Sequence, residues 1–130
     1  MVARAGRGAH GQYCPFRSRP SFAPELVDTW RSLGDQVAER AVTLGAVPDG
    51  QAATVASFSQ IAPLPAGDLR DYDVIREVAD RVTEVAARAR ARARIEVVPS
   101  RDPVSQDLLI GVTGTLEQQL WMLRVQRPHA

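Results

Sequence analysis

The stretch around Val27 to Gly45 constrains the fold of this chain more than any other, because its apolar residues recur in steps of three and four. These residues are Leu26, Trp30, Leu33, Val37, Ala41 and Leu44. Steps of this size place side chains on one stripe of a helix. The sequence therefore predicts a long amphipathic helix whose apolar stripe faces a core.

Three acidic residues of the same helix, Asp28, Asp35 and Glu39, project away from that stripe when ~100° separates successive residues. Asp35 and Glu39 lie one turn apart, so their carboxylates are neighbours. Like charges at this spacing cost about 0.2–0.5 kcal/mol on an isolated helix unless a cation or a partner subunit offsets the repulsion. Spacing alone leaves two interpretations open: a solvated acidic face, which is the common case, and a pair of metal ligands.

The remaining chain predicts two further long helices and one long connection. We expect an all-α chain with long helices at about Pro24 to Leu44, Asp71 to Ile95 and Pro103 to Val125. The last helix begins with a cap residue followed by proline, Asp102-Pro103, which is a typical start. The arginine-rich end of the middle helix has basic residues on opposite ridges, so it does not predict a single basic face. We expect these arginines to stabilise the negative end of the helix dipole.

The amino-terminal segment lacks any helical or alternating period. It combines glycines and Pro20 with four arginines, Arg4, Arg7, Arg17 and Arg19. Proline lacks an amide donor and is tolerated mainly in the first turn of a helix. We therefore expect residues 1–23 to be irregular, a single helical domain at 24–126, and a short tail at 127–130.

Composition excludes several classes of protein. The net charge of +1 gives no overall reason to expect nucleic acid or an acidic membrane as a partner. Cys14 is the only cysteine, so no internal disulfide can form. The absence of a long apolar run argues against a signal peptide or a membrane span, so we expect a cytoplasmic protein. The sequence has no glycine-rich phosphate loop and no paired-cysteine zinc pattern. It also has no serine or cysteine nucleophile with a general base at a suitable spacing.

Two motifs resemble those of the Dps family, the ferritin-like DNA-protecting proteins of starved bacterial cells. The first is Asp35-x-x-Ala38-Glu39-Arg40, and the second is Leu116-Glu117-x-Gln119-Leu120-Trp121-Met122-Leu123-Arg124. The similarity covers roughly Phe16 to Gln126. It implies a ferritin-like four-helix bundle with a truncated or irregular first helix. The connection of about twenty residues then serves as the crossover between the middle helices.

The resemblance also implies a site and partners. In that family the acidic pair of the second helix binds iron between two subunits, and Asp35 and Glu39 occupy those positions. It further implies a homo-oligomeric shell of twelve subunits that stores iron as a ferroxidase. A short helix in the crossover would lie at the dimer two-fold axis, with Phe58 and Ile61 at the interface. Non-specific DNA binding would use the basic terminus, through Arg4, Arg7, Arg17 and Arg19.

The chain departs from the family pattern where the histidine ligands belong. With Phe16-Arg17-Ser18 aligned to the family's Phe-Arg-Ser, Pro20 stands at the second histidine, Pro24 at a further acid and Gly8 at the first histidine. His10 reaches the first position only if two residues have been deleted, so it is a weak candidate. Weak iron binding at Asp35 and Glu39 follows, and whether ferroxidase activity survives is left open.

Three classes of function remain open at this stage. The first is a Dps-like iron-binding and iron-storage protein that protects DNA, with an impaired metal site. The second is a non-catalytic shell or a DNA-associating helical protein that has lost ferroxidase activity. The third is a small helical interaction module whose acidic face is only solvated. Trp121 is expected to be a packing residue in each case.

Overall fold

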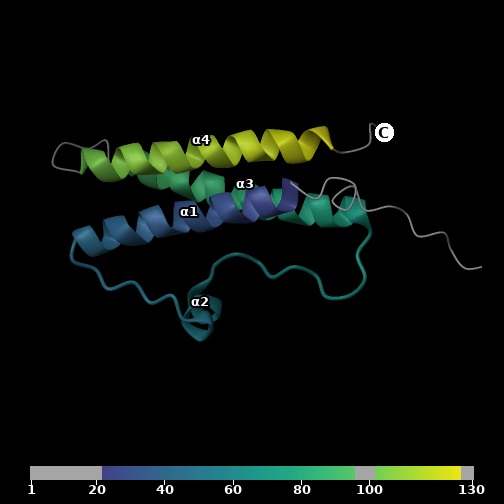
Figure 1. Cartoon of the computed structure of the whole chain (residues 1–130), viewed down its shortest axis with the longest axis horizontal. Coiled ribbons are helices and arrows are strands. Elements are labelled where there is room, and N and C mark those ends of the chain that lie inside the picture. Colours follow the sequence, from purple (N-terminus) through teal and green to yellow (C-terminus); the bar gives the residue numbers. More distant parts are fainter. Residues whose placement is uncertain (1–21, 96–101, 127–130) are drawn as a thin grey trace, which may run out of the picture.

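The computed structural model describes residues 22–95 and 102–126, and all regular structure within them is α-helical (Figure 1). Helix α1 spans Phe22–Thr43, α2 spans Ala52–Phe58, α3 spans Asp71–Ile95 and α4 spans Pro103–Val125. The three long helices lie side by side, while α2 stands apart on the crossover. The expected all-α fold with three long helices is confirmed. The expectations for residues 1–21 and for the tail 127–130 lie outside the described residues.

The core forms where α3 and α4 pack along each other, and α1 packs against α4 as well. Its buried members are Leu26, Ile75, Ala79, Val82, Ala86, Ala89, Val112, Leu116, Leu120 and Leu123. The face that α3 contributes is rich in alanine, and small side chains allow two helices to approach closely. The most deeply buried large side chains, Ile75 and Leu123, come from these two helices. The α3–α4 seam is therefore the centre of the fold.

Only the first half of the apolar stripe on α1 behaves as a core face. Leu26 is buried, and Trp30 and Leu33 pack against the core in partly buried positions. Val37 and Leu44 remain 42% and 60% exposed, respectively. The prediction that the whole stripe enters a core is thus wrong for these two residues in the single chain. Each Å² of apolar surface that stays in water lowers the stability of the fold by about 25 cal/mol relative to its burial.

Two polar contacts join α1 to α4. The indole nitrogen of Trp30 donates a hydrogen bond of 2.6 Å to the side-chain oxygen of Gln119, which is only 5% exposed. Near the other end of α1, Arg40 forms an ion pair with Asp102 and a hydrogen bond to the hydroxyl of Ser105. Because an unpaired buried amide oxygen is costly, the Trp30 contact fixes how far α1 can slide along α4.

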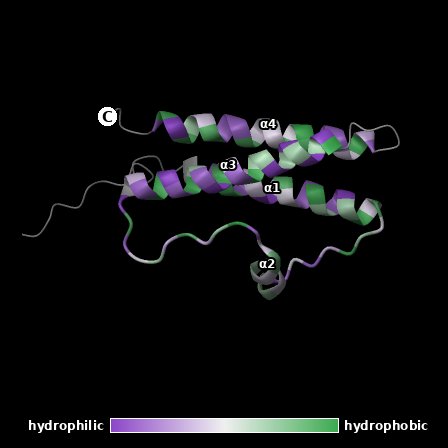
Figure 2. Ribbon diagram, turned by 180° about the vertical axis from the view of Figure 1, so that it is seen from behind, coloured by the Kyte–Doolittle hydropathy of each residue, from purple (hydrophilic) through white to green (hydrophobic). Residues whose placement is uncertain are grey.

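Some large apolar side chains are exposed on the outer surface of the helices. None of the residues of α2 is buried, and Phe58 is 80% exposed. Figure 2 shows hydrophobic residues at several places along the crossover. Trp121 on α4 is 66% exposed, so its expected packing role is wrong within this chain. These large apolar side chains therefore remain in contact with solvent in the single chain.

Asp102 caps α4 and carries a charge whose effect on stability depends on pH. Its carboxylate accepts hydrogen bonds from the Ser105 hydroxyl and from Arg40, and these contacts lower its pKa from 3.8 to about 2. A carboxyl whose folded pKa is depressed stabilises the fold above its unfolded pKa, and that stabilisation is lost as the pH falls through the folded pKa.

We therefore expect Asp102→Asn to lower the melting temperature at pH 7, since asparagine keeps the helix cap but removes the charge. The difference from the wild type should shrink as the pH falls from about 4 to about 2, the window set by the two pKa values. Thermal melting followed by circular dichroism measures this. Asp107→Asn, an exposed change on the same helix, is the control, and an equal pH dependence in both variants would contradict the prediction.

Candidate metal site

Asp35 and Glu39 lie one turn apart on the exposed side of α1, as the sequence predicts. Together with Ala38 and Val42 they line a shallow hollow on that helix. The spacing of the helix, rather than any contact with α3 or α4, brings the two carboxylates together. The acidic pair is therefore presented outward, away from the core of its own chain.

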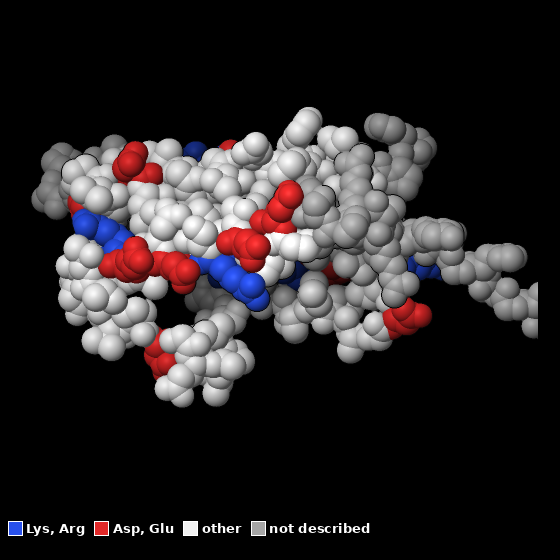
Figure 3. Space-filling view, viewed as in Figure 1, with Lys and Arg blue, Asp and Glu red and all other residues white. Residues whose placement is uncertain are grey.

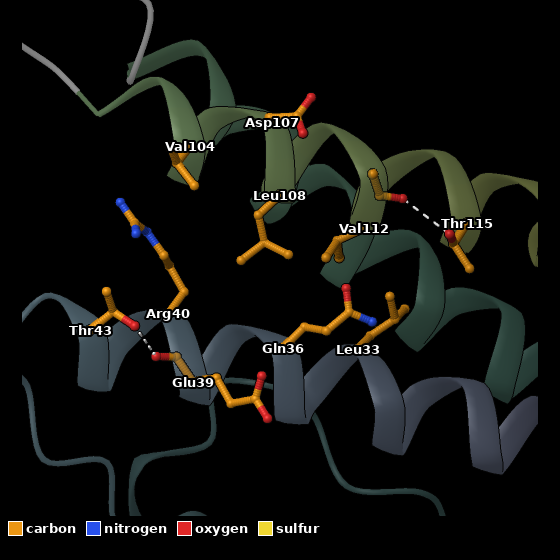
Figure 4. Close-up of a pocket in the computed structure, with 11 residues that line it drawn as sticks. Leu33, Gln36, Glu39, Arg40, Thr43, Val104, Asp107, Leu108, Val112 and Thr115 are labelled. Atoms are coloured by element: carbon orange, nitrogen blue, oxygen red, sulfur yellow. Dashed lines mark hydrogen bonds between the residues drawn. The ribbon is translucent and has the colours of Figure 1, made fainter.

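Glu39 also borders an open groove of about 570 Å³ between α1 and α4. Figure 4 shows Leu108 and Val112 pointing into this groove from α4, whereas the Glu39 carboxylate turns along the outer side of α1. The Thr43 hydroxyl donates to the backbone carbonyl of Glu39, at 2.9 Å, so this contact leaves the carboxylate itself unengaged. No hydrogen bond or ion pair from the described part of the chain engages the Glu39 carboxylate.

Neither carboxylate of the pair forms an ion pair with any residue in the described ranges 22–95 and 102–126. Arg40, the next residue in the chain, turns instead to Asp102. By contrast, Asp28 on the same helix pairs with Arg31 at 3.5 Å. Figure 3 shows groups of acidic side chains with basic side chains between them, so the face that it draws carries charges of both signs.

The two carboxylates provide part of a coordination sphere. Carboxylate oxygens suit hard divalent cations, and ferrous iron also accepts them. Within the part of the chain that the structure describes, no three His, Cys, Asp or Glu side chains gather as a possible metal site. Among the described residues, Asp35 and Glu39 therefore offer carboxylate oxygens to a cation without a third protein ligand beside them.

Other predicted site residues lie outside the described residues. They are His10 as the weak metal candidate, and Arg4, Arg7, Arg17 and Arg19 as the weak DNA candidates. The same holds for Pro20 and Gly8, which stand at the family's histidine positions. These assignments therefore remain predictions from the sequence.

The arginine-rich end of α3 does not form one basic face. Arg90 forms an ion pair with Glu117 of α4. Arg88 contacts Glu84 of its own helix and a carbonyl of the crossover. Arg92 and Arg94 stand in the last turn, where cations offset the negative end of the helix dipole. The sequence indicated the dipole effect, but it did not indicate that Arg88 and Arg90 join separate segments of the fold.

Comparison with known proteins connects this geometry to a family. The family described as the ferritin-like domain matches residues 20–127. The chain is 33% identical over 92 residues to DNA protection during starvation protein 2 of Deinococcus radiodurans, covering 71% of this chain and 37% of the relative. It is 30% identical over 103 residues to the DNA protection during starvation protein of Agrobacterium fabrum, covering 76% and 63%.

A third relative carries a different kind of name. The fine tangled pili major subunit of Haemophilus ducreyi is 32% identical over 98 residues, covering 75% of this chain and 51% of the relative. The matches thus span between 37% and 63% of the length of these three relatives. No helix in the described ranges is long and apolar enough to cross a membrane.

We expect Asp35→Asn combined with Glu39→Gln to abolish divalent-metal binding, because both oxygen donors lose their charge. Isothermal titration of the wild type with Mn²⁺ should show weak binding, with a dissociation constant on the order of 10⁻⁴–10⁻³ M, as in loose carboxylate sites. The matched control is Glu25→Gln combined with Asp28→Asn, which removes the same charge from the same helix. If the first double variant were more stable and bound metal unchanged, the pair would be only a solvated acidic face.

Proposed function

This chain belongs to the Dps family of ferritin-like proteins, and on that premise we propose that it is the subunit of a homo-oligomeric shell that binds iron weakly and protects DNA. The observation that carries the proposal is the pair Asp35 and Glu39 on the outward side of α1, which forms no ion pair within the described residues. The resemblance gives that pair a role as ligands between subunits. A site shared between chains explains why the acids point away from their own core.

Assembly is supported by the apolar surface that a single chain leaves exposed. The exposed side chains are Val37 on α1, Leu44 directly after that helix, Phe58 on α2 and Trp121 on α4. Burying such side chains between copies recovers stabilisation of about 25 cal/mol per Å². We therefore propose that the isolated chain is marginally stable and that the assembled form is the functional one. The twelve-subunit stoichiometry is taken from the family resemblance.

The proposed site handles iron as its substrate and stored cargo. Asp35 and Glu39 would hold a ferrous ion, and water would complete its coordination, because Pro20 and Gly8 stand where the family has histidines. Loss of ligands lowers the affinity and leaves the ion less well positioned for oxidation. The proposed ferroxidase activity is accordingly impaired, and His10 is the one weak candidate for a replacement ligand.

Protection of DNA is proposed from the names of two relatives and from the basic amino terminus. Two of the related proteins are named for DNA protection during starvation. Each terminus would contribute modest, salt-dependent attraction to phosphates, and repetition over a shell would raise the overall avidity. We propose a cytoplasmic location on the same family basis.

A second candidate function is a non-catalytic shell or a DNA-associating helical protein without ferroxidase activity. The incomplete donor set in the described residues favours it. The relative named as a pilus major subunit is consistent with a role in assembly rather than in iron chemistry. The two candidates share a fold and an assembly, and they differ in whether ferrous iron is bound and oxidised.

Two measurements on the purified protein test this function. Light scattering should give one discrete assembly many times the 14.2 kDa mass of the chain. Ferrous iron plus peroxide should then be oxidised little faster than in protein-free buffer. Rapid oxidation that is lost in His10→Ala would show an intact site with a replacement ligand. A monomer at all concentrations would contradict the shell, and an assembly without iron binding would favour the second candidate.

The DNA proposal has its own test in a gel-shift titration at rising salt. We expect changing Arg4, Arg7, Arg17 and Arg19 to glutamine to weaken binding by the assembled protein, because each lost phosphate contact removes about one unit from the salt dependence. A matched variant changes four exposed arginines of the described chain to glutamine, namely Arg31, Arg70, Arg76 and Arg124. Binding that survives the first set of changes would assign DNA contact to other residues.

A further inference from the structure

We propose that Arg81 and Arg88 are positioning residues that hold the crossover against α3 and so fix where α2 stands when a second copy binds it. This inference rests on the proposed assembly. It begins with a ridge of alternating charge on α3, formed by Glu77, Arg81, Glu84 and Arg88. At ~100° per residue this ridge lies roughly opposite the buried alanines that face α4.

Arg81 is held by its own helix before it reaches the crossover. One terminal nitrogen, Nη1, lies 2.6 Å from a carboxylate oxygen of Glu77, and both side chains are largely shielded from solvent. Its Nε donates to the carbonyl of Ala62 at 3.2 Å, and Nη2 donates to the carbonyl of Pro63 at 2.9 Å. One guanidinium therefore binds two successive carbonyls of the crossover.

Arg88 repeats this arrangement two turns further along α3. Its Nη2 donates to the carbonyl of Gln60 at 3.0 Å and also contacts the carboxylate of Glu84. In both pairs the glutamate precedes the arginine by four residues, which is the favourable order on a helix. A guanidinium is a planar fork that loses less freedom per hydrogen bond than a flexible amine. The two glutamates thus orient the two forks toward the backbone of residues 60–63.

The crossover has little else to hold it. Within the described residues, these three hydrogen bonds are the only ones that join residues 46–70 to the long helices, apart from the backbone bonds at the two ends of the crossover. Pro63 and Pro65 have no amide hydrogen to donate. No residue of α2 is buried. The hydrogen bonds that hold α2 in place therefore come from the two arginines and from the ends of the segment.

Fixing the crossover has a consequence for binding. Val55 and Phe58, one turn apart on α2, are both more than half exposed, so they present apolar surface outward. A loop that is already ordered before binding loses less conformational entropy when a partner docks. The occupant that the proposed assembly supplies is a second copy of this chain. Arg81 and Arg88 would then strengthen assembly without touching the partner.

The test uses Arg81→Gln, Arg88→Gln and the double variant, with Arg92→Gln as the matched control on the same helix. Chymotrypsin cleavage after Phe58, measured at a dilution at which all variants are monomeric, reports how firmly the crossover is held, since the segment 46–70 contains no other aromatic side chain. Sedimentation at several protein concentrations reports assembly, and circular dichroism reports the helices. We expect the double variant to be cleaved about tenfold faster and to assemble about tenfold more weakly, a change of 1.4 kcal/mol, with unchanged helix content.

Each result decides a separate part of the inference. Unchanged cleavage in the double variant would overturn the role of the arginines in holding the crossover. Faster cleavage with wild-type assembly would overturn their role in positioning α2. If Arg81→Gln unfolds the chain, the more exposed Arg88→Gln carries the test alone. A wild-type chain that never assembles would refute the proposed shell, while its cleavage rates would still decide whether the arginines hold the crossover.

Discussion

The close packing of α3 on α4 is the interaction on which the rest of the structure depends. The alanines of α3 let the two backbones approach, and the leucines of α4 fill the seam between them. Helix α1 then attaches to α4 through Leu26, Trp30 and Arg40. A helix whose apolar stripe is covered along only part of its length leaves both apolar and acidic surface exposed, and this incomplete coverage links the fold to the proposed function.

Two kinds of exposed surface follow from that arrangement, and they have the same physical solution. The apolar side chains on α1, α2 and α4 lack a covering element in the described chain, and the carboxylates of Asp35 and Glu39 form no ion pair within the described residues. In the proposed assembly, another copy of the chain covers the apolar side chains. A metal ion held between the two copies neutralises the carboxylates. Assembly and metal binding are therefore expected to support each other, since a partner that buries the acidic pair without a cation would pay for desolvating two like charges.

Helical periodicity predicted the long helices because local spacing and caps determine where a helix begins and ends. It also placed Asp35 and Glu39 together on an exposed face, since one helix fixes their relation. It was wrong about Val37, Leu44 and Trp121, because an apolar position becomes buried only if another element covers it. The contacts of Arg81 and Arg88 with the crossover were not predicted, since the path of a loop is not encoded in a repeat. The Glu-to-Arg spacing of four residues, present twice on α3, was the one available signal.

The central claim is that Asp35 and Glu39 form the surviving half of an iron site between two copies of this chain. Anomalous X-ray scattering at the iron edge, from crystals of the assembled protein soaked in ferrous iron without oxygen, tests it most directly. The account predicts an iron peak at these two carboxylates, at an interface between subunits, with water completing the coordination. A site with a full set of histidine ligands, or iron bound only elsewhere on the assembly, would contradict it.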